Sequence, residues 1–316
     1  MTRPLVSIIM PVFNGERWLS EAIESVLRQS WGRLELIIVD DGSTDESVRI
    51  AEHFASRSVV VLRQANQGAS VARNAGLALA QGDFIQYLDA DDLLDPRKIE
   101  LQIGALSDAP GQVATCAWAR LYDGIGGAQF EPSVLWRNFA PVDFLVAAYA
   151  SMHFMPNHAW LTPRAISDRA GTWPPMRARN DDAEYFAKVV LQSSGVRFVP
   201  EARAYYRSGH SGLSAASDRE ALEGYLWTLD QIADRLLAAE DSTRTRSALA
   251  ASIDHFVSSV EVAAPDLARS AEQRVHRLVG RRFVMPNDGL SMRVLSRLLG
   301  RSGARALRRA LRRRVR

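Results

Sequence analysis

The sequence predicts an α/β fold with a doubly wound, mainly parallel sheet, followed by an α-helical C-terminal region. Over the first 120 residues, short apolar runs alternate with helix-like stretches of 10–15 residues. From about Asp218 onward the pattern is helical. Regular alternation of strands and helices is typical of right-handed β-α-β units, which build a parallel sheet covered by helices.

The predicted strands are apolar runs of four to six residues, rich in Val and Ile, as expected for strands buried on both faces. They span Leu5–Met10, Leu34–Val39, Ser58–Leu62, Asp83–Leu88 and Val113–Ala117. The helices expected between them are Glu16–Gln29, a second helix that Ser43 and Glu46 would cap as a capping box, Ala69–Ala80 and Pro96–Leu106.

The alternation is lost over residues 121–180, where we expect loops, a short helix near Val142–Tyr149 and a strand near His158–Thr162. A helix over 181–192 and a strand over Val196–Val199 follow. Three more helices are expected near 218–239, 244–262 and 265–280, before a basic amphipathic tail over about 290–316. The sequence therefore predicts a catalytic-type α/β unit over 1–215 and a helical unit over 216–316.

The composition is that of an ordinary globular protein, with 47% hydrophobic and 24% charged residues. No stretch is long and apolar enough for a signal peptide or a membrane span, and a lone Cys116 excludes an internal disulfide, so we expect a cytoplasmic protein. Residues 293–316 hold ten arginines and no acid, and the rest of the chain, with 29 basic and 36 acidic side chains, has a net charge of −7. An acidic body argues against nucleic acid as a partner.

The tail has leucines near helical spacing, with arginine on its other faces. A basic amphipathic helix is typical of proteins that bind an anionic membrane surface. We therefore expect the protein to be peripheral on the inner face of the membrane, and the alternative is a solvated tail.

Polar segments follow four successive predicted strands: PVFNG at 11–15, DDGSTD at 40–45, RQANQG at 63–68 and DADD at 89–92. The carboxyl ends of parallel strands meet at one edge of a sheet, where ligands of open α/β folds bind. The chain has no GxGxxG after the first strand and no GxxxxGK[ST], HExxH or GxSxG, which argues against dinucleotide-binding, P-loop, zinc-protease and serine-hydrolase sites. Four converging loops still predict a ligand site.

PVFNG, VDDGSTD, NQGASVARNAG, YLDADD and the later NDDAEYF resemble, in order and spacing, the family-two inverting glycosyltransferases of GT-A fold, over roughly residues 4–214. The resemblance implies a nucleotide-sugar donor, with a UDP-sugar favoured, and Mn²⁺ or Mg²⁺ bridging its phosphates. The acceptor would be a hydroxyl of a glycan or a lipid-linked molecule. The QxxRW element of processive relatives is missing, which favours transfer of one sugar, or a few, per encounter.

The same resemblance assigns roles to the acids. Asp91 would be the metal ligand, with Asp89 near the ribose or bound through water, and clustered carboxylates suit a divalent cation that relieves their repulsion. Asp182 would be the general base, with burial and a neighbouring carboxylate raising its pKa. Asp92 is expected to cap the following helix. The alternative for these acids is turn and helix-cap chemistry.

The remaining donor contacts also come from the resemblance. Asp41 would accept a hydrogen bond from the base, while Pro11 and Phe13 would pack against it. Asn66 and Arg73 match the third loop, and Arg73 would face base or phosphate.

Two later segments are less specific. In YYRSGHSGLSA, Arg207 would meet the diphosphate and His210 would complete the metal shell. Acceptor or diphosphate contacts are expected near His153, Asn157 and His158. Three tryptophans could either stack on a sugar or pack in the protein core: Trp136, Trp160 and Trp173.

Two other functions remain open from the sequence. A nucleotidyltransferase of related fold would need a basic loop on a triphosphate, and the first loop offers only Arg17. A non-catalytic nucleotide-sugar-binding protein would not need both Asp91 and Asp182. A glycosyltransferase of polysaccharide or glycoconjugate biosynthesis is therefore the favoured function.

Overall fold

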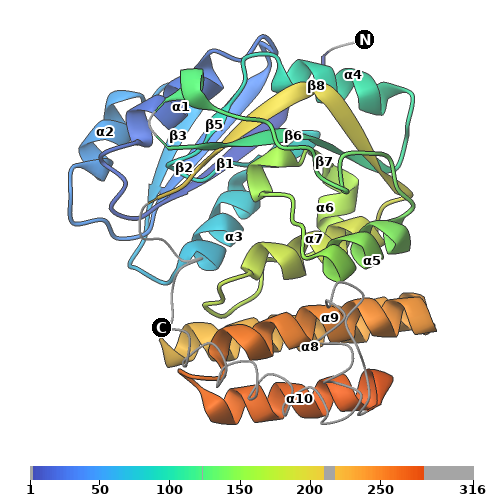
Figure 1. Ribbon diagram of the computed structural model, residues 1–316. Helices are drawn as coiled ribbons and strands as arrows, with labels where there is room; N and C mark the ends of the chain where they lie inside the picture. Colours follow the sequence, from blue (N-terminus) through green and yellow to red (C-terminus); the bar gives the residue numbers. More distant parts are fainter. Residues whose placement is uncertain (1–2, 123, 210–217, 281–316) are drawn as a thin grey trace.

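The computed structural model describes residues 3–122, 124–209 and 218–280. Two sheets form the upper part of the molecule, and three stacked helices lie below them (Figure 1). The larger sheet has the strand order β3-β2-β1-β4-β7. It comprises β1 (Val6–Val12), β2 (Leu34–Asp40), β3 (Val59–Arg63), β4 (Phe84–Tyr87) and β7 (Thr162–Pro163).

The first four strands run parallel, as the sequence predicts, and β7 pairs antiparallel with β4. Every residue of β1 is buried, because this strand is central and helices cover both of its faces. The strands β1, β2 and β3 follow one another toward one edge of the sheet. The chain then crosses over the sheet to β4, which lies on the other side of β1. The switch point between β1 and β4 leaves a crevice at their carboxyl ends.

Right-handed crossovers determine where the first helices lie. The helices α1 (Leu19–Leu27) and α2 (Ser47–His53) cover one face of the larger sheet, and α3 (Ala69–Leu79) covers the other (Figure 1). The capping box expected for α2 is not formed. Instead Asp45 Oδ1 accepts a hydrogen bond from Ser47 N at 3.0 Å, and Ser43 Oγ accepts one from Asn14 N at 3.0 Å. Ser43 thus joins the first two polar loops rather than beginning the helix.

The second sheet has the order β5-β8-β6 and was not foreseen. It comprises β5 (Leu93–Leu94), β6 (Gln112–Leu121) and β8 (Gly195–Arg207), with α4 (Lys98–Ser107) packed against β6 and β8. The strand predicted at Val113–Ala117 belongs here, where it pairs in parallel with β8, and not to the doubly wound sheet. Because Leu93 pairs with Tyr205, the end of β8 lies beside the DADD turn.

The middle of the chain is more ordered than predicted. The helix near Val142–Tyr149 is confirmed as α5 (Pro141–Ser151), and the helix at 181–192 as α7 (Asp181–Leu191). The strand expected near His158–Thr162 is a 3₁₀ turn, Asn157–Ala159, followed by the two-residue β7. The helix α6 (Arg164–Ala170) and the 3₁₀ turn Ile125–Gly127 were not expected.

The three C-terminal helices are confirmed as α8 (Arg219–Ala239), α9 (Thr243–Val260) and α10 (Pro265–Val279). They share a core of their own, while Ile232, Leu236 and Leu249 join the main core, where α8 packs on α7 and α9 on α5. Among the described residues, no helix is long and apolar enough to cross a membrane. The predicted tail at 290–316 and His210 lie outside the described residues.

Close packing of α8 gives a stability prediction. A Cβ added at Gly224 would lie 2.1 Å from the backbone oxygen of Arg177, in the segment that leads into α7. Gly224→Ala is therefore expected to destabilise the protein by about 1–3 kcal/mol, although alanine favours a helix. Gly104→Ala in α4 is the control, because nothing lies within 4 Å there, and it should stabilise by about 0.5–1 kcal/mol. Urea unfolding of both variants checks this, and a Gly224→Ala variant as stable as the wild type would contradict it.

Candidate active site

A cavity of about 640 Å³, here called the main cavity, collects polar side chains from both halves of the chain. The DADD turn after β4 contributes Asp89, Asp91 and Asp92. The start of α7 contributes Asp181 and Asp182. The opposite wall comes from the C-terminal helices through Tyr225, Leu229, Ser252 and His255. Carboxylates predicted from distant motifs therefore face one cavity, which has the size of a small-molecule site.

Arg73 joins the two acidic segments. Its Nη2 donates to Asp89 Oδ1 at 2.8 Å, and its Nη1 donates to Asp181 Oδ2 at 2.8 Å. The guanidinium lies 4.3 Å from the ring centroid of Trp173 and is almost fully buried. Ser70 Oγ also donates to Asp181 Oδ2, at 2.9 Å. Helix α3 thus fixes the distance between the DADD turn and α7, because Arg73 holds both.

Asp182 has the electrostatic environment of a base that works near neutral pH. Burial and the neighbouring charge of Asp181 raise the pKa of Asp182 to about 7, and Arg73 counteracts this only in part. One of its oxygens accepts a hydrogen bond from Ala183 N at 2.8 Å. Asp181 accepts one from Asp182 N at 2.9 Å, so Asp181 fixes the start of α7 and Asp182 faces the cavity. Asp181 is therefore held by hydrogen bonds to its neighbours, whereas Asp182 is the acid of this pair with the raised pKa.

Asp89 lies in the opposite environment. Burial raises its pKa, but the charge of Arg73 and the hydrogen bonds from Arg73 and Asn157 outweigh burial and leave the pKa below its ordinary value. Asn157 Nδ2 donates to Asp89 Oδ2 at 2.8 Å, from the 3₁₀ turn after α5. Asp89 is thus ionised and held on both oxygens, while Asp182 holds its proton up to about pH 7.

Asp92 does not cap the following helix, which corrects the prediction. The helix α4 begins at Lys98, and Asp92 instead accepts a hydrogen bond from Arg207 N at 2.7 Å. Its second oxygen lies 2.8 Å from His158 Nδ1. Both partners are distant in sequence, and they tie the DADD turn to β8 and to the 3₁₀ turn. Burial raises the pKa of Asp92.

Arg207 is held by protein groups on all sides. Its Nε donates to Asp91 O at 2.7 Å, its Nη2 donates to Glu21 Oε2 at 2.7 Å, and its guanidinium lies 3.8 Å from the ring centroid of Trp18. The side chain is nearly inaccessible. These contacts explain Arg207 as a residue that positions the Asp91 backbone, and its predicted contact with a diphosphate stays a prediction.

The metal set can be tested for chemical fit. Asp91 lines the main cavity beside Asp89, and both offer carboxylate oxygens, which Mg²⁺ and Mn²⁺ prefer. No group of three His, Cys, Asp or Glu within 3–122, 124–209 and 218–280 could hold a metal by itself. One or two carboxylates suit a cation that shares its shell with substrate phosphates, because Mg²⁺ is usually bound in that way. The residues present therefore fit such a cation, and Asp91 as its ligand stays a prediction.

Four residues predicted to bind the nucleobase end of the donor do not line the main cavity: Pro11, Phe13, Asp41 and Asn66. Asp41 is buried, and it accepts hydrogen bonds from Gln64 Nε2, Gln67 N and Gly68 N at 2.7–2.9 Å. It thereby fixes the third loop, which carries the exposed Asn66. Phe13 is 51% exposed and Pro11 is buried in β1. Contacts of these four residues with a base stay predictions.

Some residues of the cavity escaped the sequence analysis. Tyr149, Arg179, Tyr225 and His255 line it, and no local motif marks any of them. The tryptophan alternatives are settled for two residues: Trp160 and Trp173 are buried, and Trp173 stacks on Tyr185 with ring centroids 4.4 Å apart. They form packing rather than a sugar platform.

Comparison with known families supports the fold and the general activity. The model of glycosyl transferase family 2 matches residues 7–170, more than half of the chain. The chain belongs to glycosyl transferase family 2. It is therefore a member of a glycosyltransferase enzyme family, and the matched region contains the DADD turn and Arg73.

Curated relatives match this family 2 glycosyltransferase over its N-terminal part. An uncharacterized glycosyltransferase of Haemophilus influenzae is 46% identical over 106 residues, which cover 33% of this chain and 42% of that protein. The putative glycosyltransferase EpsE of Bacillus subtilis is 38% identical over 137 residues, which cover 42% of this chain and 49% of that protein. The chain thus spans less than half the length of these curated relatives.

A solved structure shares the whole fold. The crystal structure of S. aureus TarS in complex with UDP-GlcNAc superposes with a TM-score of 0.75 at 17% identity, covering 98% of this chain and 92% of that one. A second TarS structure, in complex with UDP, gives a TM-score of 0.70 at 18% identity, covering 96% and 87%. This likeness confirms the GT-A fold with its C-terminal helices.

Proposed function

We propose that this family 2 glycosyltransferase is a metal-dependent, inverting and non-processive enzyme, which transfers a sugar from a UDP-sugar to a hydroxyl of a glycan or lipid-linked acceptor. Its setting would be polysaccharide or glycoconjugate biosynthesis. The observation that carries the proposal is that Asp91 and Asp182 line one cavity while Asp182 has a raised pKa. The UDP and UDP-GlcNAc complexes of TarS support a nucleotide-sugar donor.

Asp182 is the group that moves a proton. Its carboxylate accepts the proton of the acceptor hydroxyl while that oxygen bonds to the anomeric carbon and the bond to the diphosphate breaks. One displacement of this kind inverts the anomeric configuration. Asp91 would hold a divalent cation, which would supply Lewis-acid stabilisation to the departing diphosphate.

Arg73 and Asp181 orient the reacting groups. Arg73 keeps Asp89 ionised and holds α7, and Asp181 accepts the hydrogen bond of Asp182 N. The spacing of the general base from the DADD turn is therefore set before the substrates bind, which lowers the entropic part of the barrier. The absence of a QxxRW element supports transfer without processive movement.

Release of UDP from a panel of UDP-sugars tests the proposal. UDP release is expected from at least one UDP-sugar with Mn²⁺ or Mg²⁺, and it should fall to background with a chelator and return with excess metal. The anomeric configuration of the product, read by proton NMR, should be inverted relative to the donor. Release that is insensitive to the chelator, no release from any sugar nucleotide, or a retained configuration would contradict the respective part of the proposal.

The pH profile tests the role of Asp182. Because the base must be deprotonated and its pKa is raised to about 7, kcat/KM should rise as the pH increases through about 7 and level off above it. Initial rates at saturating metal between pH 5.5 and 9 measure this, with UDP affinity recorded at each pH as the control. A profile that is flat between pH 6 and 8 would rule out Asp182 as a base with this pKa.

Membrane recruitment stays a separate proposal, since it rests on the ten arginines of residues 293–316 alone. We propose cytoplasmic, peripheral binding to the inner membrane face. Full-length protein should sediment with anionic liposomes more strongly than a protein of residues 1–290, and equal sedimentation would remove the idea.

A further inference from the structure

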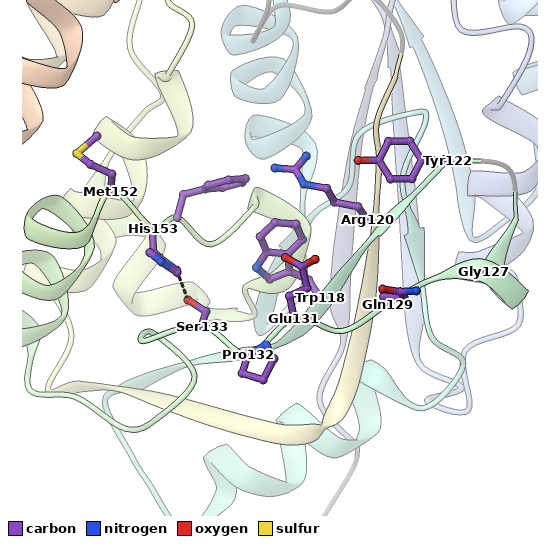
Figure 2. Close-up of a pocket in the computed structure, with 11 residues that line it drawn as sticks. Trp118, Arg120, Tyr122, Gly127, Gln129, Glu131, Pro132, Ser133, Met152 and His153 are labelled. Carbon is purple, nitrogen blue, oxygen red and sulfur yellow. Dashed lines mark hydrogen bonds between the residues drawn. The ribbon is translucent and has the colours of Figure 1, made fainter. Parts of the chain in front are cut away.

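A second cavity of about 470 Å³, here called the aromatic cavity, adjoins the main cavity. Figure 2 shows the side chains that line it. The two cavities share Arg120, Met152, His153 and Phe154, so they lie next to each other. Asp182, Asp91 and the described residues predicted to bind the donor nucleotide do not line the aromatic cavity, whereas His153, where an acceptor or diphosphate contact is expected, lines both cavities.

The aromatic cavity is built on one face of a strand and a segment that returns beside it. Trp118 and Arg120 are two residues apart in β6, and Tyr122 follows two residues later, just after the strand. Side chains at this spacing lie on one face (Figure 2). The returning chain forms an isolated antiparallel bridge between Gln129 and Arg120. Ser133 Oγ and His153 Nδ1, 2.9 Å apart, link that segment to the end of α5.

A left-handed residue lies at the boundary of the two cavities. The helix α5 ends at Ser151, and Met152, its C-cap, has a φ of 60°; Asn14 is the other described non-glycine residue with positive φ. This conformation costs about 1–2 kcal/mol for a residue other than glycine. It turns the chain directly before His153 and Phe154, which both cavities share. Strain retained at such a position is common at ligand sites.

Apolar side chains are exposed around the aromatic cavity to an unusual degree. Of the nine large hydrophobic side chains described as exposed, four belong to residues 122–154: Tyr122, Ile125, Val134 and Phe154. Tyr122 is 62% and Phe154 42% exposed, and both line the cavity. Large exposed apolar patches on a soluble protein mark binding surfaces. The ring of Phe154 lies 5.0 Å from that of Trp118, so two aromatic residues form a continuous wall.

The charges of the aromatic cavity favour an uncharged ligand. One cation, Arg120, and one anion, Glu131, line it, together with the hydrogen-bonding side chains of Gln129, Ser133 and His153. These two opposite charges leave the described lining without a net charge that would select an ionic ligand, and a lipid chain would leave the polar groups without partners. A sugar ring suits the site, because its C–H face packs on an aromatic ring while its hydroxyls bond to planar polar side chains.

We propose that the aromatic cavity binds a neutral sugar unit of the acceptor, at least one unit away from the hydroxyl that reacts at Asp182. This inference rests on the proposed function, because it assigns the acceptor of that same site. It means that the acceptor is a glycan of two or more units, with an uncharged sugar in the aromatic cavity. The hydroxyl in the main cavity and the distal sugar are then bound by different segments of the chain.

A glycan array tests the proposal without requiring turnover. Full-length protein, loaded with UDP and Mn²⁺ and carrying a fluorescent tag, is applied to printed neutral and anionic mono-, di- and oligosaccharides. We expect binding to at least one neutral di- or oligosaccharide and none to the matching monosaccharides. Tyr122→Ala and Phe154→Ala should each lower that signal at least tenfold.

Leu79→Ala is the matched control, since Leu79 is 45% exposed at the end of α3 and lines neither cavity. It should bind the array as the wild type does. The melting temperature of each variant shows whether it is folded. Binding to anionic glycans alone, no binding to any glycan, or equal binding by Tyr122→Ala and Phe154→Ala would overturn the inference. Failure of metal-dependent UDP release is a separate outcome, because the array does not depend on transfer.

Discussion

Asp182→Asn is expected to lower kcat by roughly 10²–10⁴-fold while UDP binding is retained. Asparagine has nearly the same shape, but it cannot take the acceptor's proton. The hydrogen bond from Ala183 N to an oxygen of residue 182 can persist, so α7 should start as before. Transfer rates with saturating donor and metal measure the loss, and calorimetry with UDP measures donor binding.

Asp168→Asn is the control for this variant, because Asp168 is an exposed acid of α6 outside the main cavity. It should transfer sugar at the wild-type rate. Unchanged turnover in Asp182→Asn would show that another group takes the proton.

Asp182→Asn should also raise the thermal stability of the protein at alkaline pH. The pKa of Asp182 is raised in the folded protein, so folding favours its protonated form, and the wild type loses stability as the pH rises from the ordinary range of a carboxyl through about 7. Asparagine does not ionise, and Asp182→Asn should therefore melt above the wild type at pH 8. The difference should shrink as the pH falls and vanish below about 3.8, the ordinary pKa of this carboxyl, where Asp182 carries its proton in both the folded and the unfolded state.

Arg73→Met is expected to destabilise the protein by about 3–5 kcal/mol, because it leaves the buried carboxylate of Asp181 and the partly buried one of Asp89 without their cation. Methionine fills much of the same volume, so the loss reports charge more than packing. Urea unfolding at pH 7.5 measures it. Arg49→Met is the control: its ion pair with Glu46 is exposed, and its loss should leave the stability of the protein nearly unchanged.

The destabilisation of Arg73→Met should shrink in acid. The pKa of Asp89 is lowered in the folded wild type, so the stability that this carboxylate contributes is present above its unfolded pKa and is lost as the pH falls through the folded value. Without Arg73 that contribution is missing at neutral pH, and protonation removes the unpaired charges. A difference between variant and wild type that stayed constant from pH 7.5 to pH 4 would contradict the role given to Arg73.

The sequence was a good guide where local pattern and burial agree. The apolar runs of β1, β2 and β4 are mostly buried, whereas β3 lies at the sheet edge and only its Val59 is buried, so two-sided burial was wrong for that strand. The helices α8, α9 and α10 were found because a 3.6-residue period over 15 or more residues is hard to mistake.

The second sheet was missed because β8 does not look like one strand. Within β8 only Val196–Val199 is mainly apolar, with Arg197 inside it, and Pro200 and Glu201 resemble the end of a strand. In the structure the register with β6 skips at this point, from Val199 opposite Cys116 to Arg203 opposite Ala117. A β-bulge of this kind interrupts the pairing of the two strands. The local sequence does not show at which residue the pairing continues.

The partners of the acids could not be predicted either. Arg73 and Asp181 are 108 residues apart, and Asp92 and Arg207 are 115 apart. The motifs identify residue types, but the pairing depends on how α3, α7 and β8 pack. Asp92 could equally have capped a helix, and only the position of β8 decides that it accepts a hydrogen bond from Arg207 N instead.

The helices α8 and α9 supply the wall of the main cavity that faces the acids, and their side chains there lie outside the region that the family model matches. The cavity therefore combines acids from the DADD turn and from α7 with a wall that the C-terminal helices supply. Substitutions at Tyr225, Leu229 or His255 can retune what fits against the acids while leaving the ion pairs of Arg73 untouched. Chimeras that exchange this helical wall between proteins of the same fold would inherit new selectivity without new chemistry.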